Sequence, residues 1–155
     1  MRDTDVPSVA RISSGSTPAD EAQLRDELAR PWSRLWVVRE ADDVPVAFLI
    51  AWHVADELHV LNLVTRVDRQ RLGLARALLI TAIAYARGSH IRHILLEVRR
   101  SNRGAILLYR SVGFFAKGAR PNYYPDHEDA VEMALLLDPT SGVIAAVEDE
   151  IHLES

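Results

Sequence analysis

The chain contains no cysteine. It can therefore form no disulfide bond, hold no metal through thiolates and use no cysteine as a nucleophile. It also lacks any run of about 18 uninterrupted apolar residues, the length that a membrane-spanning helix requires. The first residues, MRDTDVPSVARISSGS, contain none of the apolar stretch of a secretory signal. Because nothing in the chain argues for export, we expect a cytoplasmic protein.

We find no internal repeat and no low-complexity tract. Of the 155 residues, 48% are hydrophobic and 26% are charged, which is typical of one globular domain with a sizeable core. The net charge of −4 argues against non-specific binding of nucleic acid, for which a basic surface is expected.

Positive charge is nevertheless concentrated in one segment, residues 66–76. It holds four arginines and a single acid, which are Arg66, Arg69, Arg71, Arg76 and Asp68. Two interpretations of this cluster are open. It could bind a small polyanionic ligand, or it could be a face of arginines that contacts only water.

The pattern of apolar residues predicts helices and strands in a mixed order. We expect a helix at residues 18–29, with Thr17 as its N-cap and Pro18 in its first turn. The whole order predicts a mixed α/β (α+β) domain, antiparallel at its start and with crossover helices in the middle. The expected strands are residues 8–12, 34–40, 46–54, 57–65, 91–98, 114–119 and 130–137, and the later helices are residues 73–87 and 103–111.

Residues 61–79 (LNLVTRVDRQRLGLARALL) carry the strongest indication of a ligand. A strand runs through a loop into a long helix, and Gly73 has no side chain to obstruct a close backbone approach. The first amides of a helix lack intrahelical partners and carry partial positive charge, so they can bind a phosphate. The motifs of P-loop and dinucleotide-binding proteins are both missing. The alternative is a glycine that merely begins a helix.

The loop sequence Gln70-Arg71-Leu72-Gly73-Leu74-Ala75 resembles the Gln/Arg-x-x-Gly-x-Gly/Ala signature of the GNAT superfamily of N-acetyltransferases. The resemblance implies the GNAT acyl-CoA N-acyltransferase fold, with a central, mostly antiparallel mixed sheet flanked by helices. It also implies that acetyl-CoA binds as the acetyl donor, through loop amides and through backbone groups of the preceding strand. The implied cofactor-binding residues are Leu63, Val64, Thr65, Gln70, Arg71, Leu72, Gly73, Leu74, Ala75, Arg76 and Asn102.

The similarity continues toward the C-terminus. Residues 95–114 (LLEVRRSNRGAILLYRSVGF), the NYYP of residues 122–125 and the later EDA and MAL tripeptides resemble the ribosomal-protein-alanine N-acetyltransferases, the RimI group. The resemblance covers about two thirds of the chain, residues 34–137. We therefore expect a single N-acetyltransferase domain in residues 1–137 and an extension of unmatched role in residues 138–155.

Two side chains could carry the chemistry. Glu97 lies on an apolar strand, where poor solvation suits a proton acceptor; it could equally be exposed, or paired with Arg99 or Arg100. Tyr109 follows Glu97 by 12 residues, and its alternative is a core aromatic on a helix face. The resemblance implies that Glu97 is the general base and Tyr109 the general acid.

Three more residues have two interpretations each. Asn102 can cap the helix that follows it, and the resemblance adds a hydrogen bond to the cofactor. Tyr123 and Tyr124 lie in a loop. The resemblance implies that they line the acceptor site, and the alternative is that they pack onto the sheet. The histidines lack the spacing of a metal site, so we assign no metal.

The implied reaction moves the acetyl group of acetyl-CoA to the N-terminal α-amine of a protein, such as the N-terminal alanine of a small-subunit ribosomal protein. Direct attack is feasible because an α-amine has a pKa of about 8 and is readily neutralised. Two alternatives stay open: acetylation of a lysine or a small-molecule amine, and a CoA-binding sensor without catalysis. We expect a monomer or homodimer that binds neither nucleic acid nor membrane.

Overall fold

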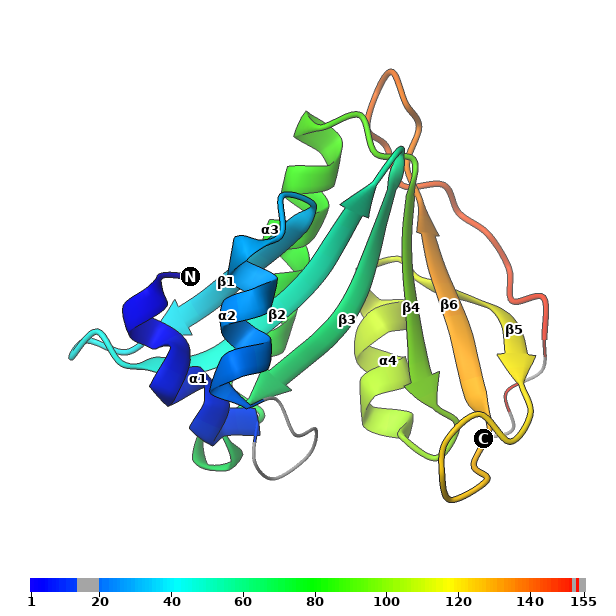
Figure 1. Cartoon of the computed structure of the whole chain (residues 1–155). Coiled ribbons are helices and arrows are strands. Elements are labelled where there is room, and N and C mark those ends of the chain that lie inside the picture. The colour runs from blue at the N-terminus through cyan, green and yellow to red at the C-terminus, as the bar shows by residue number, and fades with distance from the viewer. Residues whose placement is uncertain (14–19, 152, 154–155) are drawn as a thin grey trace. The chain divides into compact units, whose positions relative to one another are not determined.

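The computed structural model describes residues 1–13, 20–151 and 153. The chain forms two compact units, Met1–Val54 with Val60–Ala82 and Ala55–His59 with Ile83–Ser155. The strand order is β1-β2-β3-β4-β6-β5 (Figure 1). The pairs β1–β2, β4–β6 and β5–β6 are antiparallel, and β3–β4 is parallel. The mixed α/β class and the mostly antiparallel sheet that the sequence predicted are confirmed.

Most helices and strands begin and end within two residues of their predicted positions. In the part of the chain that the structure describes, no helix has the length and apolar character needed to cross a bilayer. The helices are η1 (Asp3–Asp5), α1 (Val6–Ser13), α2 (Glu21–Ala29), η2 (Val67–Arg69), α3 (Leu74–Gly88) and α4 (Arg103–Val112). The strands are β1 (Ser33–Arg39), β2 (Pro45–Val54), β3 (Glu57–Thr65), β4 (His93–Arg99), β5 (Phe115–Arg120) and β6 (Ala130–Leu136).

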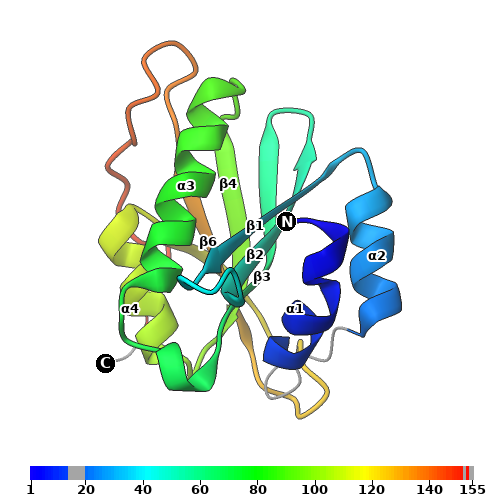
Figure 2. The same ribbon diagram turned by 90° about the vertical axis from the view of Figure 1, so that its left-hand side faces the viewer.

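The first unit corrects one prediction. The strand expected at residues 8–12 is wrong, because this segment belongs to helix α1. Val6 and Val9 are completely buried in one apolar cluster with Phe48 and Ile50 of β2. Their spacing of three residues puts both on one helical face. Packing of that face therefore outweighs the strand propensity of a short segment. Figure 2 shows α1 beside α2, both next to the first strands.

The start of α2 also differs from the prediction. Its N-cap is Asp20 rather than Thr17; Thr17 and Pro18 lie outside the described residues. Asp20 accepts a hydrogen bond from the Gln23 amide at 2.8 Å, and the Gln23 side chain accepts one from the Asp20 amide at 3.2 Å. This reciprocal capping box satisfies two amide donors and fixes the helix start.

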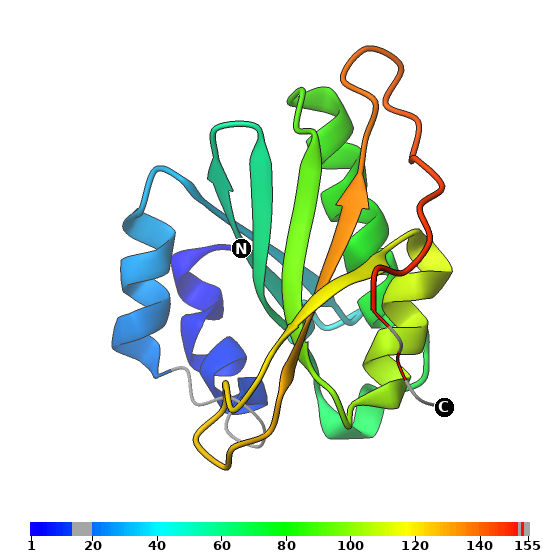
Figure 3. The same cartoon turned by 90° about the vertical axis from the view of Figure 1, so that its right-hand side faces the viewer.

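The second unit is organised around β4. It lies between β3 and β6 in the sheet, as its apolar sequence predicted (Figure 3). Ile94, Leu96 and Val98 are buried, whereas the alternate residues, including Glu97, are only half-buried. Alternation along a strand therefore puts Glu97 on the face opposite to Leu96 and Val98. The parallel pairing of β3 with β4 joins residues 57–59 to residues 93–95.

Both ends of α4 have the expected caps. The Asn102 side chain accepts a hydrogen bond from the Ala105 amide at 3.2 Å. Gly113 ends the helix at a φ of 117°, a conformation that favours glycine. A side chain on Gly113 would also meet Ile144 at 3.0 Å.

Residues 145–150, red in Figure 3, belong to the second unit and are hydrogen-bonded to its strands. The Ala145 amide donates to the Leu136 carbonyl at 2.9 Å. Further along, the Glu150 amide donates to the Ala116 carbonyl at 2.8 Å, and the Ala116 amide donates to Asp149 at 2.9 Å. These bonds attach residues 145–150 to strands β6 and β5.

One carboxylate in the first unit is almost completely buried. Asp5 is 4% exposed, and Arg39 of β1 donates to both of its oxygens at 2.5 Å. The backbone amide of Arg2 donates to Oδ2 at 2.7 Å. The hydrogen bond from Arg39 holds the pKa of Asp5 below its usual value, against the opposing effect of burial.

We predict that Asp5→Asn lowers the free energy of unfolding by about 3 kcal/mol at neutral pH, because Arg39 loses a buried ion-pair partner. Among the residues that the structure describes, the carboxylate that remains near Arg39 is Asp43, at 3.7 Å. The folded-state pKa of Asp5 is depressed, so its stabilisation is present above about pH 4 and is lost as the pH falls through the folded value. Urea denaturation at a series of pH values measures both effects.

Asp3→Asn is the matched control, because Asp3 is an exposed acid in the same turn. It should change the free energy of unfolding by no more than about 0.5 kcal/mol. Equal losses for the two variants would mean that the Asp5–Arg39 pair contributes nothing specific.

Candidate active site

The loop before α3 has the geometry of an anion site in the first unit. Gly73 has a φ of 80°, and Arg71 has a φ of 64°. A side-chain carbon built on Gly73 meets nothing within 4 Å. The Ala77 amide donates to the Gly73 carbonyl at 3.0 Å, which leaves the amides of the first turn, residues 74–76, outside the helical hydrogen-bond series. These amides and the open space beside Gly73 could hold a phosphate.

The arginine cluster beside this loop is less cationic than its sequence indicates. Arg66 donates to Asp68 at 2.6 Å, and Arg69 donates to Glu40, an acid from the end of β1. The hydrogen bond between Arg66 and Asp68 raises the pKa of Arg66 and lowers the pKa of Asp68. Among the described residues, Arg71 is exposed and has no carboxylate partner. Binding of a polyanion would therefore depend on Arg71 and the helix end more than on the whole cluster.

The other predicted cofactor residues lie on either side of this loop. Leu63, Val64 and Thr65 are half-buried at the end of β3, and Gln70 Nε2 donates weakly to the Thr65 carbonyl at 3.4 Å. Leu72 is 65% exposed. In the first turn of α3, Leu74 and Ala75 are half-buried and Arg76 is exposed. The first unit thus gathers ten of the eleven predicted cofactor residues, and Asn102 lies in the second unit.

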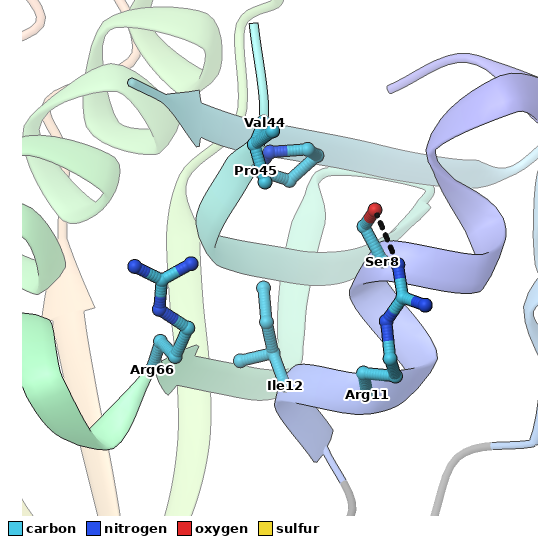
Figure 4. A pocket seen from close by; sticks show the side chains of 6 residues that line it. All are labelled: Ser8, Arg11, Ile12, Val44, Pro45 and Arg66. Carbon is cyan, nitrogen blue, oxygen red and sulfur yellow. Dashed lines mark hydrogen bonds between the residues drawn. The ribbon is translucent and has the colours of Figure 1, made fainter. Parts of the chain in front are cut away.

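A cavity of about 250 Å³ lies elsewhere in the first unit (Figure 4). Arg11 of α1 donates to the Ser8 hydroxyl at 3.3 Å on one side, and Arg66 stands on the other. The sequence did not predict this cavity, because its lining comes from three separate segments. The lining residues are Ser8, Arg11, Ile12, Val44, Pro45 and Arg66. None of the predicted site residues is among them.

Glu97 lies in a cluster of polar side chains in the second unit. Its side chain is 30% exposed, and Oε1 is 3.7 Å from Nη1 of Arg120. A hydrogen bond with Glu97 is the largest cause of the raised pKa of Tyr123. The expected alternative partners are engaged elsewhere: Arg99 contacts Asp126 and Glu128 at 2.9 and 3.0 Å, and Arg100 contacts Asp129 at 3.8 Å.

Tyr109 faces inward from α4. It is 9% exposed, and its ring centroid is 5.7 Å from that of Phe114. Burial raises the pKa of Tyr109 to about 12, with a smaller contribution from nearby Tyr124. The pKa of Tyr124 is raised by burial, and Glu97 raises it further. Electrostatic effects thus link Tyr124 to both predicted catalytic residues.

The loop between β5 and β6 is held against the end of β4. The Arg99 guanidinium lies 4.1 Å from the ring centroid of Tyr124, and the rings of Tyr123 and Tyr124 meet edge to face at 5.1 Å. The Ser101 amide donates to Glu128 at 2.9 Å. Tyr124 is half-buried by these contacts, whereas Tyr123 remains 47% exposed.

Sequence reasoning missed Arg120 and Glu132, which join Glu97 on the same sheet face. Glu132 lies directly opposite Glu97 on β6, and Arg120 Nε donates to Glu132. The signal for Glu132 was available: like Glu97, it is a glutamate within an otherwise apolar strand (AVEMALL). Within the described ranges, no group of three or more His, Cys, Asp or Glu side chains could hold a metal ion.

Comparisons with known proteins agree with the sequence resemblance. Residues 6–114 match the family described as the acetyltransferase (GNAT) family. The ribosomal protein bS18-alanine N-acetyltransferase of Salmonella typhimurium is 45% identical over 98 residues, which are 61% of this chain and 66% of that protein. The chain therefore matches slightly less than two thirds of that relative's length.

Two other similarities extend over most of the chain. A putative ribosomal protein bS18-alanine N-acetyltransferase of Bacillus subtilis is 30% identical over 136 residues, 86% of this chain and 90% of that protein. The crystal structure of the ribosomal-protein-S18-alanine N-acetyltransferase from Escherichia coli has a TM-score of 0.79 and 34% identity, over 86% of this chain and 88% of that one. With these findings the resemblance is confirmed, and the chain belongs to the acetyltransferase (GNAT) family.

Proposed function

We propose that this protein transfers the acetyl group of acetyl-CoA to the N-terminal α-amine of another protein. The first candidate acceptor is the N-terminal alanine of ribosomal protein bS18, because the relatives in Salmonella typhimurium and Escherichia coli are named for that reaction. The observation that carries the proposal is that Glu97, Tyr109, Tyr123 and Tyr124 all lie in the second unit. There Arg120 contacts both Glu97 and the ring of Tyr123, and the rings of Tyr123 and Tyr124 meet edge to face. An acceptor on a ribosomal protein would be met in the cytoplasm.

Acetyl-CoA would supply the activated acetyl group as a thioester. The amides of residues 74–76 and the side chain of Arg71 would bind its diphosphate, and backbone groups of residues 63–65 would pair with the pantetheine arm. Gln70, Leu72 and Gly73 would shape this loop, and Asn102 would add a hydrogen bond. Support comes from the positive φ values at Arg71 and Gly73 and from the open space beside Gly73.

Glu97 would remove the proton that the acceptor amine must lose. The amine nitrogen attacks the thioester carbonyl, a C–N bond forms, and the C–S bond then breaks to release CoA thiolate. The ammonium proton passes to Glu97, directly or through water. Tyr123 and Tyr124 would line the acceptor site next to this carboxylate. Tyr123 is suited to this role because it is half exposed and hydrogen bonds with Glu97.

Tyr109, the predicted general acid, would assist the leaving group as a hydrogen-bond donor. A phenol with a pKa of about 12 stays protonated at neutral pH and can donate a hydrogen bond to sulfur. Complete transfer of its proton to a thiolate, whose conjugate thiol has a pKa of about 8.5, is unfavourable. We propose that Tyr109 donates a hydrogen bond that strengthens as charge develops on sulfur.

Thiol release from acetyl-CoA tests the acceptor assignment. With a peptide that begins Ala-Arg, we expect turnover that persists when lysines are blocked and disappears when the N-terminus is blocked. Turnover only with lysine or small amines would overturn the acceptor assignment. Binding of CoA without turnover on any amine would instead indicate a sensor.

Substitution of the two catalytic candidates should separate their roles. We predict that Glu97→Gln lowers kcat/KM by about 10² to 10⁴ and that Tyr109→Phe lowers kcat by roughly 10- to 100-fold, since removing a donor to developing charge costs at most about 10³. The dissociation constant of CoA should change little in either case. Tyr85→Phe makes the same chemical change on α3 as Tyr109→Phe, and an equal loss in both variants would refute a specific role for Tyr109.

A third prediction concerns the cofactor loop. Gly73→Ala should weaken CoA binding about tenfold, because a side chain at a φ of 80° costs about 1–2 kcal/mol and shifts the loop amides. Calorimetric titration with CoA measures the change. Gly88→Ala, at the other end of α3, is the control, since Gly88 has neither a positive φ nor a close neighbour. Equal effects in the two variants would argue against phosphate binding at the loop.

A further inference from the structure

Glu97 lies directly opposite a second carboxylate on the neighbouring strand. The β4–β6 register pairs Glu97 with Glu132, and their side chains are 30% and 29% exposed. Like charges that lie directly opposite on antiparallel strands repel each other. A cation close to both carboxylates relieves this repulsion.

Arg120 of β5 is that cation, but it forms a hydrogen bond with only one of the two carboxylates, Glu132. Its Nε donates a hydrogen bond to Oε1 of Glu132. Its Nη1 remains 3.7 Å from Oε1 of Glu97, beyond hydrogen-bond length. The raised pKa of Arg120 has the same order of causes, with the hydrogen bond to Glu132 first and the charge of Glu97 second.

Gly118 gives Glu132 the room for this contact. The β5–β6 register places Gly118 beside Glu132, so Gly118, Glu132 and Glu97 form one row across three strands. A side-chain carbon built on Gly118 would lie 3.3 Å from Oε2 of Glu132. The missing side chain at Gly118 thus leaves space over β5 in which the Glu132 carboxylate reaches Arg120.

No other cation replaces Arg120 at Glu97 among the described residues. Arg99, two residues along β4, is held by Asp126 and Glu128. The other titratable and charged groups on β4, on strands β3, β5 and β6, on α4 and in the loop before β6 are the following. They are His93 and Arg99 of β4, Glu57 and His59 of β3, Glu132 of β6, Lys117 and Arg120 of β5, Arg103, Tyr109 and Arg110 of α4, and Tyr123, Tyr124, Asp126, His127, Glu128 and Asp129 of the loop.

We infer that Glu132 is a positioning residue that keeps the Arg120 guanidinium off Glu97, so that Glu97 retains its affinity for the proton of the acceptor amine. The inference deepens the proposed function, because it rests on Glu97 as the base. Glu132 touches neither acetyl-CoA nor the acceptor in this role. It acts only through Arg120 and through its own charge.

Removal of Glu132 should make Glu97 a weaker base. In Glu132→Gln, Arg120 has one carboxylate left and moves onto Glu97, which stabilises the ionised form. Loss of the neighbouring negative charge acts in the same direction. In Arg120→Gln the opposite holds, because two carboxylates face each other without a cation.

The first experiment needs no catalytic activity. The pH titration of the Glu97 carboxyl carbon is followed by NMR in the full chain labelled with ¹³C at glutamate carboxyls, with Glu97→Gln to assign the signal. We expect the midpoint in Glu132→Gln to lie lower than in the unsubstituted protein by about half a pH unit or more, and the midpoint in Arg120→Gln to lie higher. Glu21→Gln, which removes an exposed acid paired with Arg25 on α2, should leave the midpoint in place.

The double variant, Glu132→Gln with Arg120→Gln, separates the effect of Arg120 on Glu97 from the direct repulsion between Glu132 and Glu97. If Glu132 acts through Arg120, Glu132→Gln shifts the Glu97 midpoint more in the unsubstituted protein than in the Arg120→Gln background. Equal shifts in both backgrounds would overturn the positioning role. An unchanged Glu97 midpoint in Glu132→Gln would overturn the whole inference.

The second experiment is the pH dependence of kcat/KM for the Ala-Arg peptide. The acidic limb should move to lower pH in Glu132→Gln, with a lower plateau, and to higher pH in Arg120→Gln. A purely structural role would lower kcat/KM without moving the limb, and that result would count against the inference. If the unsubstituted protein has no turnover, the proposed function fails, while the NMR titration still decides whether Glu132 controls the charge of Glu97.

Discussion

The antiparallel pairing of β4 with β6 is the constraint on which the candidate chemistry of the second unit depends. Its register sets Glu97 opposite Glu132 and Arg99 opposite Ala130. The loop before β6 therefore ends beside Arg99. There the Arg99 guanidinium lies over the ring of Tyr124, which belongs to that loop. A slip of one residue would turn every side chain of β4 to the other face. Burial of Leu96 and Val98 makes that slip unfavourable.

The two units supply different kinds of binding group. In the first unit the candidate site is made of backbone: the amides that open α3 and the conformations of Arg71 and Gly73. Two of the four arginines beside it are already paired with acids. In the second unit the candidate site is made of side chains, and burial or a neighbouring carboxylate raises the pKa values of its three tyrosines. Function should therefore be sensitive to backbone conformation in one unit and to electrostatics in the other.

Three of the arginines that contact two carboxylates each have different consequences for the protein. Arg39 lies between Asp5 and Asp43, Arg99 between Asp126 and Glu128, and Arg120 between Glu132 and Glu97. Only the first arrangement includes a carboxylate that is almost completely buried, so it should contribute most to stability. The Arg99 pairs are more exposed and contribute little net energy, but they orient the loop that carries Tyr123 and Tyr124. In the third arrangement we propose that the position of Arg120 affects the charge of Glu97.

The sequence by itself determined most of the elements, the family and the residue types of the candidate site. Four residues could be recognised because local backbone geometry and strand alternation depend on neighbouring residues in the chain. They are Gly73 at the start of α3, Asn102 and Gly113 at the ends of α4, and Glu97 within an apolar strand. Local signals misled at residues 8–12, where burial of one face against β2 produced a helix. Tertiary structure alone decided that Glu40 neutralises Arg69 and that Glu132 and Arg120 stand beside Glu97. These partners are separated by 23 to 35 residues in the chain, and only strand pairing brings them within the few ångströms over which charges interact strongly.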